Sequence, residues 1–421
     1  MSLPRPALDH GPLGPLPGMQ YDPVKKRYFF VRANAPAPSP VPSKQLLPPT
    51  GCVEEGRHKR RRAEGADAGP SDYRRRRGAA VRRPRQTDDR LMEDRIAQLR
   101  QKTTHHLGAC HSESITSIKT FSGGAYYATT DHGKVIIHRA DGEATQVSIC
   151  RQGLIGLHCD IPRMIMMAVA GGSEAHVHHF RRDPELLEHV FMQHSEINLP
   201  HGDIFCMSSF DGICSLGGTR SLITIQTDSR IMSKHRRLVS DPLAIHQSGH
   251  DLVYAGLRGS TVSLEDLRIA PGMPNVVAAM PGGKAIVGVK RLKDSAVPWG
   301  LAASAMGDEM LIFDVRFGRE PLHRLEGHVN NFHQNLGLAT SPDDQFVFAA
   351  GSDKRIRCWS TLTGRRVSPP IDTLDNLNRG PVGPSLLSTT FAHRVSAMEV
   401  RDDWGVDVAV QGELQRFGPV F

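Results

Sequence analysis

The sequence of 421 residues contains no run approaching the roughly 18 to 20 apolar residues of a membrane span, and its start lacks the apolar core of a secretion signal. Its seven cysteines are odd in number and form no Cys-x-x-Cys pair. This pattern argues against a disulfide framework and favours reduced thiols in an intracellular protein. We therefore expect neither a membrane protein nor a small secreted domain held by disulfides.

Catalytic motifs are also missing. Residues 281–285 contain a Gly-Lys pair, but a phosphate-binding loop requires a hydroxyl side chain where Ala285 stands. The sequence has no Gly-x-Ser-x-Gly nucleophile elbow and no His-Glu-x-x-His zinc motif. It thus predicts a protein that is not an enzyme and needs no cofactor.

Histidine is frequent, with 21 residues, and on a strand His176 and His178 would point to the same face. Such a pair can share a metal ion, but the sequence indicates no third or fourth ligand, unless the fold brings Cys150 and Cys159 near. The alternative is that these are partly buried histidines of a sheet. We favour this alternative and predict no metal site.

Basic charge is concentrated at the start of the chain. The sequence up to Thr103 has 22 basic and 11 acidic residues, the remainder has 30 basic and 33 acidic residues, and 14 of the 29 prolines precede residue 100. A basic, proline-rich segment buries too little apolar surface to offset the entropy lost on ordering. We expect residues 1–86 to be a disordered extension, whereas the rest is long enough for a sizeable core.

Two basic clusters lie within this extension: Lys59, Arg60, Arg61 and Arg62 form the first, and Arg74, Arg75, Arg76 and Arg77 the second. Such clusters serve as nuclear import signals or as arms that bind nucleic acid, and a solvated tail without a partner is the remaining alternative. We predict nuclear localisation, with or without a cytoplasmic pool, and leave nucleic acid open as a partner.

A helix is expected over residues 87–103. Thr87 can cap its start, and Asp88 and Asp89 suit the positive end of the helix dipole. Apolar residues then recur at helical spacing with an arginine beside them: Leu91, Met92, Arg95, Ile96 and Leu99. This face docks either in a groove of a partner, which we favour, or on the chain's own domain.

From about residue 104 the chain repeats a hairpin of short alternating strands. Seven tight turns lie between apolar runs at intervals of 42, 46, 39, 50, 45 and 59 residues, starting at Thr130, Gly172, Gly218, Leu257, Gly307, Ser352 and Gln411. A period near 45 residues with four short strands per unit is typical of a β-propeller, which needs several blades to bury its sheet faces. We predict an all-β, seven-bladed propeller over residues 104–421.

The sixth unit resembles a WD repeat over its full length. Gly327-His328 matches the Gly-His pair of that family, Ser352-Asp353 its tight turn, and Trp359-Ser360 its Trp-Asp pair. The resemblance implies a WD-repeat propeller in which His328, Asp353 and Trp359 share a structural hydrogen-bond network. The other six units match the pattern poorly and are supported by the repetition.

The third strands of units four and five both end in Asp-x-Arg, with Asp266 and Arg268 in one and Asp314 and Arg316 in the other. Tandem endings of this kind resemble the WDxR boxes of the WD-repeat substrate receptors of cullin-four RING ubiquitin ligases. The resemblance implies that both arginines face the propeller adaptor that joins receptor to cullin. An arginine at a rigid strand end offers directional donors to a partner; the alternative is that it pairs within its own loop. The tryptophan of the box is replaced in both units, by Glu265 and Phe313.

A second resemblance lies in residues 16–31, LPGMQYDPVKKRYFFV. This segment is similar to an N-terminal box in the family of cullin-associated WD factors, found in the fourth of its numbered members. The box reads Leu-Pro-Gly-x-x-Tyr-Asp-Pro-x-x-x-Arg-Tyr-Phe. Tyr21 and Asp22 precede a proline and favour a turn, and Tyr28 and Phe29 supply an apolar anchor in a polar extension. The box is either a docking peptide or a strap packed on the propeller, with the strap favoured.

Together these features predict a non-catalytic substrate-receptor subunit of a cullin-four RING ubiquitin ligase. Its partners would be the adaptor, the cullin and a protein substrate. The alternative is a nuclear WD-repeat scaffold in a ribonucleoprotein or chromatin complex, in which the basic tail binds nucleic acid.

Overall fold

The computed structural model describes residues 19–22, 27–30, 86–106, 113–121, 124–140, 142–160, 165–172, 175–181, 193–199, 202–228, 232–270, 272, 275–369 and 383–419. The chain divides into two compact units, Met1–Gly78 and Ala79–Phe421. Both basic clusters, at 59–62 and 74–77, lie outside the described residues. Among the helices that the structure describes, none is long and apolar enough to cross a membrane.

In the first unit, the described residues form a two-stranded antiparallel hairpin of β1 (Met19–Asp22) and β2 (Arg27–Phe30). Tyr21 pairs with Tyr28, and Asp22 pairs with Arg27. The predicted docking box is therefore extended on both sides of a connection. Whether it serves as a strap or as a docking peptide stays a prediction.

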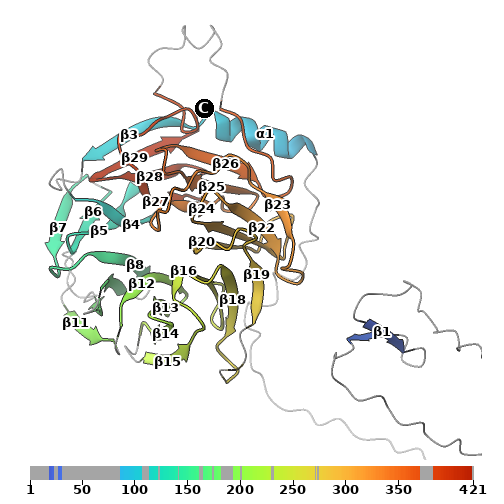
Figure 1. Cartoon of the computed structure of the whole chain (residues 1–421). Helices are drawn as coiled ribbons and strands as arrows, with labels where there is room; N and C mark the ends of the chain where they lie inside the picture. The colour runs from blue at the N-terminus through green and yellow to red at the C-terminus, as the bar shows by residue number, and fades with distance from the viewer. Residues whose placement is uncertain are drawn as a thin grey trace, which may run out of the picture. The chain divides into compact units, whose positions relative to one another are not determined.

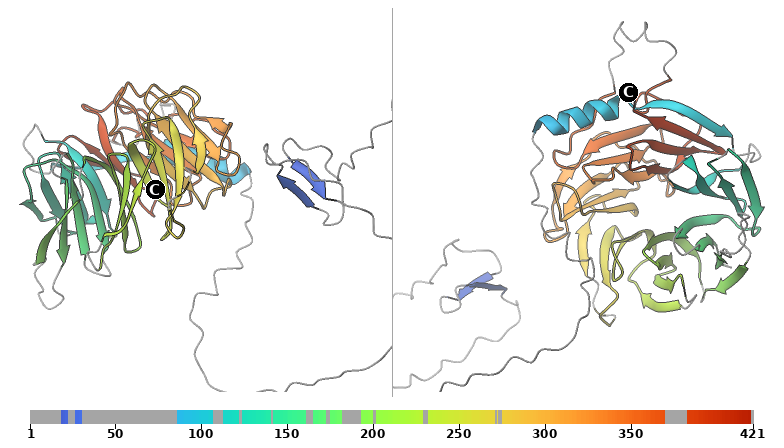
Figure 2. Two further views of the ribbon diagram at one scale, coloured as in Figure 1. Left: turned by 60° about the horizontal axis from the view of Figure 1, so that its bottom comes forward. Right: turned by 180° about the vertical axis from the view of Figure 1, so that it is seen from behind.

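The second unit is a ring of seven antiparallel sheets, which confirms the predicted seven-bladed propeller (Figures 1 and 2). Blade one contains β4 (Ile115–Thr120), β5 (Tyr126–Thr130), β6 (Lys134–His138) and β7 (Ala144–Ser148). Blade two contains β8 (Leu154–Asp160), β9 (Ile165–Ala170), β10 (His176–Arg181) and β11 (Gln193–Asn198). Blade three contains β12 (Ile204–Phe210), β13 (Ile213–Gly218), β14 (Ser221–Gln226) and β15 (Met232–Arg237).

The remaining blades follow the same order around the ring. Blade four contains β16 (Pro242–Gln247), β17 (Leu252–Leu257), β18 (Thr261–Asp266) and β19 (Val276–Ala279). Blade five contains β20 (Ile286–Leu292), β21 (Gly300–Ala305), β22 (Met310–Asp314) and β23 (Pro321–Arg324). Blade six contains β24 (Leu338–Thr340), β25 (Phe346–Ala350) and β26 (Ile356–Ser360), and blade seven contains β27 (Val395–Val400), β28 (Val406–Val410), β29 (Glu413–Gly418) and β3 (Arg100–His106).

The ring is closed by strands from opposite ends of the propeller sequence. β3 pairs antiparallel with β29, so that Arg100 lies opposite Gly418 and His105 opposite Leu414. This pairing corrects the predicted helix boundary: α1 spans Gln86–Ala97, and residues 100–103 belong to a strand. The backbone of β29 offers hydrogen bonds that a further helical turn would leave unused.

Buried apolar side chains form one cluster between each pair of neighbouring blades, giving seven clusters in the described part of the ring. The first strand of six blades also carries the same irregularity, a register shift after its first pair, as between Ile286 and Gly288 of β20. A bulge of this kind increases strand twist and bends the strand. The first strands line a central channel of about 480 Å³.

Candidate interaction surface

The Asp-x-Arg ending of β18 forms a closed ion pair at the surface of blade four. The Arg268 guanidinium donates from Nε to Asp266 Oδ1 at 2.9 Å and from Nη2 to Oδ2 at 2.6 Å, and its backbone N–H donates to Oδ1 at 3.0 Å. These hydrogen bonds lower the pKa of Asp266 to about 2. The aspartate thus fixes the direction of an arginine side chain that is 64% exposed.

The ending of β22 repeats this geometry on blade five. Arg316 donates to Asp314 from Nε at 3.0 Å, from Nη2 at 2.6 Å and from its backbone N–H at 3.0 Å. The Arg316 side chain is 51% exposed, and its hydrogen bonds hold the pKa of the Asp314 carboxyl below its usual range. Each arginine therefore pairs within its own loop, which was the alternative to binding a partner. Each also leaves part of its side chain exposed to solvent.

Exposed apolar side chains lie beside Arg316, and one follows Arg268 in the sequence. The Arg316 guanidinium lies 5.3 Å from the ring centroid of Trp299 and 5.5 Å from that of Phe317, and the Phe317 side chain is 71% exposed. On blade four, exposed Ile269 follows Arg268 as Phe317 follows Arg316. Arginine and aromatic residues are enriched at the positions of protein interfaces that contribute most to binding.

A buried arginine supports the loop that carries Trp299. The Arg291 guanidinium donates to the carbonyl oxygens of Pro298 at 2.6 Å and Gly300 at 2.7 Å, on either side of the tryptophan. The same guanidinium lies 5.7 Å from the Trp299 ring centroid. Trp299 is therefore positioned by hydrogen bonds of its neighbours and stays accessible to a partner.

On blade four, Glu265 takes the place of the family's tryptophan, and it is only 3.9 Å from Arg236 Nη1. Arg236 is buried and donates to the backbone carbonyl of Ile269, with a short contact from Nη2. On blade five, Phe313 at the equivalent place is fully buried. Glu265 thus lies beside a buried arginine, whereas Phe313 packs in the apolar core. The arginine–aspartate pair at the strand end has the same geometry in both blades.

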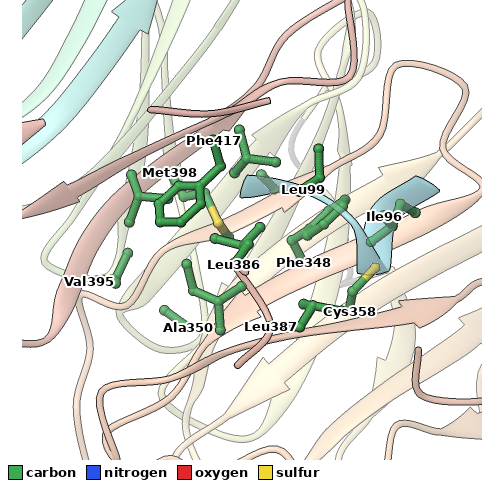
Figure 3. Packing of buried hydrophobic residues seen from close by; sticks show 14 of the residues in the cluster. Ile96, Leu99, Phe348, Ala350, Cys358, Leu386, Leu387, Val395, Met398 and Phe417 are labelled. Atoms are coloured by element: carbon green, nitrogen blue, oxygen red, sulfur yellow. The ribbon is translucent and has the colours of Figure 1, made fainter. Parts of the chain in front are cut away.

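Helix α1 packs on the propeller through the face that we expected to bind a partner. Ile96 and Leu99 are buried in the cluster between blades six and seven, beside Phe348 and Phe417 (Figure 3). Met92 packs against the same cluster. The favoured interpretation is thus wrong for these three side chains, because each is in contact with the chain's own core. Leu91, which is 61% exposed, and Arg95 remain on the solvent side.

The expected network in blade six is only partly formed. The Trp359 indole N–H donates to the Glu326 carbonyl at 3.0 Å, while the Asp353 carboxylate binds Arg357 at 2.9 and 2.5 Å. Both ring nitrogens of His328 are buried without a hydrogen-bond partner in the described part of the chain, and burial lowers its pKa to about 4. The predicted link between His328 and Asp353 is wrong, because Arg357 is a stronger, bidentate partner for the carboxylate.

His176 and His178 of blade two lie close to a glutamate, Glu196, whose carboxylate is also able to bind a metal ion. Ligand atoms of His176, His178 and Glu196 all lie within 4.8 Å of one another. The third side chain comes from β11, which pairs with β10. Glu196 could not be identified from sequence, because its place opposite His178 depends on strand register.

Similarity to known proteins places these observations in context. Residues 319–360 match the family model of the WD domain, G-beta repeat, which covers β23 to β26. The chain is 31% identical over 114 residues to an uncharacterized WD repeat-containing protein of Caenorhabditis elegans, covering 27% of this chain and 20% of that one. It is 28% identical over 143 residues to WD repeat-containing protein 82 of Drosophila melanogaster, covering 34% of this chain and 43% of that one.

The chain thus spans less than half of the length of these relatives. Its fold is similar to the crystal structure of the WD40 β-propeller domain of Doa1, with a TM-score of 0.57 and 11% sequence identity over 76% of this chain and 96% of that one. These findings support a WD-repeat protein with a propeller fold, and hence a scaffold for protein interactions.

Proposed function

We propose that this protein is a substrate-receptor subunit of a cullin-four RING ubiquitin ligase. The observation that carries the proposal is the identical presentation of Arg268 and Arg316 at the ends of neighbouring blades. Their resemblance to the WDxR boxes of such receptors supplies the identity of the partner, the propeller adaptor. WD-repeat propellers generally bind proteins without catalysing reactions, so in this proposal the other ligase subunits supply the chemistry.

Each residue of the surface has a distinct role in this proposal. Asp266 and Asp314 orient the two arginines, whose remaining donor groups bind acceptors on the adaptor. Trp299 and Phe317 exclude water from these contacts, which strengthens them. On α1, Leu91 and Arg95 extend the adaptor-binding surface, since the other residues of the predicted stripe are occupied by the propeller core.

Purification of the tagged full-length chain from cells tests the proposal. We expect the adaptor and the cullin to be retained after nuclease treatment and washing at high ionic strength. Binding that depends on phosphate contacts falls by about 10³ to 10⁵ between 50 and 200 mM salt. Partners that are lost under these conditions, in the absence of adaptor and cullin, would instead support the nuclear scaffold of a ribonucleoprotein or chromatin complex.

The basic clusters lead to a proposal on localisation. Replacing residues 59–62 and 74–77 with alanine is expected to move the protein from the nucleus to the cytoplasm, because import receptors bind clustered basic side chains. The Tm should stay unchanged, since neither cluster carries apolar residues for a core. Fluorescence imaging of tagged cells measures the distribution. A variant that stays nuclear but no longer binds chromatin or RNA would assign the clusters to nucleic acid instead.

A further inference from the structure

Two histidines and a glutamate come together at the outer part of blade two. In the pairing of β10 with β11, His178 lies directly opposite Glu196, and His176 is two residues earlier on β10. Residues at such spacing point to one face of a strand, and directly opposed residues have Cβ atoms about 4.5 to 5.5 Å apart. The register of the sheet therefore holds three ligand-type side chains on one face.

We propose that His176, His178 and Glu196 bind a divalent transition-metal ion of the zinc class. Their ligand atoms lie within 4.8 Å of one another, and His178 Nδ1 is 3.7 Å from Glu196 Oε1. Zinc–nitrogen and zinc–oxygen bonds of about 2.0 to 2.2 Å place tetrahedral ligands roughly 3.4 Å apart. The ligand atoms thus need to approach one another by at most about 1.4 Å, and the His178–Glu196 pair by about 0.3 Å.

The burial of the three side chains suits an ion that enters from solvent. His178 is fully buried, whereas the Glu196 side chain is 52% exposed. The rings of His176 and His178 are 4.7 Å apart, edge to face. A His₂Glu set leaves one position of a tetrahedral zinc ion open for water or another ligand. The buried His178 would hold the ion in a fixed position, and the exposed Glu196 would leave one side of the ion open to solvent.

A cysteine near this face is a candidate for the fourth position. Phe180, on the same side of β10 as the two histidines, belongs to the apolar cluster between blades one and two, and Cys150 packs against that cluster. The Cys150 thiol donates to the backbone carbonyl of Gln152 at 3.1 Å, and burial raises its pKa. Water is the expected fourth ligand of the open position, and cobalt spectroscopy tests Cys150 as the alternative.

The experiment uses the full-length chain, freed of metal by a chelator and dialysed. Isothermal titration with Zn²⁺ is expected to give one site, and Co²⁺ is expected to give the intense visible bands of a tetrahedral ion. A sulfur-to-cobalt charge-transfer band in the near ultraviolet indicates Cys150 as the fourth ligand, and its absence indicates water; both spectra support the site.

Two variants remove one ligand each, with little change in size. Glu196→Gln and His176→Asn should each weaken Zn²⁺ binding by at least about 100-fold, because loss of an outer-shell partner alone costs 10- to 100-fold. The matched control is His132→Asn, which removes an exposed histidine that pairs with Asp131 at 2.8 Å in blade one. This control should bind Zn²⁺ as the wild type does.

Circular dichroism and Tm of the metal-free variants check that the propeller is folded. Zn²⁺ should raise the Tm of the wild type and of His132→Asn and leave that of Glu196→Gln unchanged, since only an ion bound to the native state stabilises it. Wild-type affinity in both ligand variants, or the absence of a wild-type site with Kd below about 10 µM, would overturn the proposal and leave His178 and Glu196 as an ordinary ion pair.

Discussion

Replacing Leu99 with Asp is expected to lower the free energy of unfolding by about 4 kcal/mol or more. Leu99 is 2% exposed in the cluster between blades six and seven, so the change removes core packing and buries an unpaired carboxylate. The Tm should fall by about 6 °C or more. Thermal unfolding of the full-length variant, followed by circular dichroism, provides the measurement.

The matched control is Leu91→Asp on α1, which Leu99 follows by two residues. Leu91 is 61% exposed, so this variant should unfold at the wild-type temperature. If Leu91 contacts the adaptor, Leu91→Asp will reduce adaptor binding at constant Tm. A Leu99→Asp variant that keeps the wild-type Tm but loses adaptor would contradict the packing of α1 and restore the partner-groove hypothesis.

The double variant Arg268→Ala with Arg316→Ala is expected to reduce adaptor affinity by at least about 100-fold. Directional charged contacts at the centre of an interface contribute about 2 kcal/mol or more each, although such losses do not add in full. The Tm should change little, because exposed ion pairs such as those with Asp266 and Asp314 stabilise a protein by about 0 to 1 kcal/mol. Binding to the purified adaptor by surface plasmon resonance measures the effect.

A control arginine lies at the other end of β18. Arg258 precedes this strand, is 57% exposed and pairs with Asp241 at 3.1 Å, so it matches Arg268 in chemistry but not in position. Arg258→Ala should bind the adaptor as the wild type does. Equal binding by the folded double variant would remove the main support for the ligase proposal.

The repeated hairpins made the fold predictable from sequence. Tight turns such as those at Gly172 and Ser352 lie between apolar runs at a nearly constant period, and the propeller is the architecture that buries such runs on both faces. The equivalent positions of Arg268 and Arg316 at two strand ends were also predictable, because each strand ends in the same three-residue pattern. Local spacing carries the information in both cases.

Pairings across long distances were not predictable in this way. Arg100–His106 reads RQKTTHH, without apolar alternation, and is a strand because β29 pairs with it. Glu196 lies opposite His178 through the register of β11, and Trp299 is exposed through a loop held by Arg291. The local sequence pattern of each segment does not identify the distant residue with which it pairs.

Blade six shows a further limit of motif matching. His328, Asp353 and Trp359 stand at their expected positions, yet the carboxylate binds Arg357. Arg357 follows Asp353 by four residues and reaches it across the tight turn that precedes β26. A motif predicts which residues are near each other, whereas the strongest donor nearby decides which bond forms.

The pairing of β3 with β29 has a consequence for the order of folding. During synthesis the ribosome makes residues 100–106 long before residues 413–418, so the seventh sheet stays incomplete until β29 has emerged. Until then the apolar faces of blades one and six have no seventh blade to cover them. Contacts so distant in sequence form slowly, and exposed apolar faces favour aggregation. We therefore expect the nascent chain to be prone to aggregation until β29 has paired with β3.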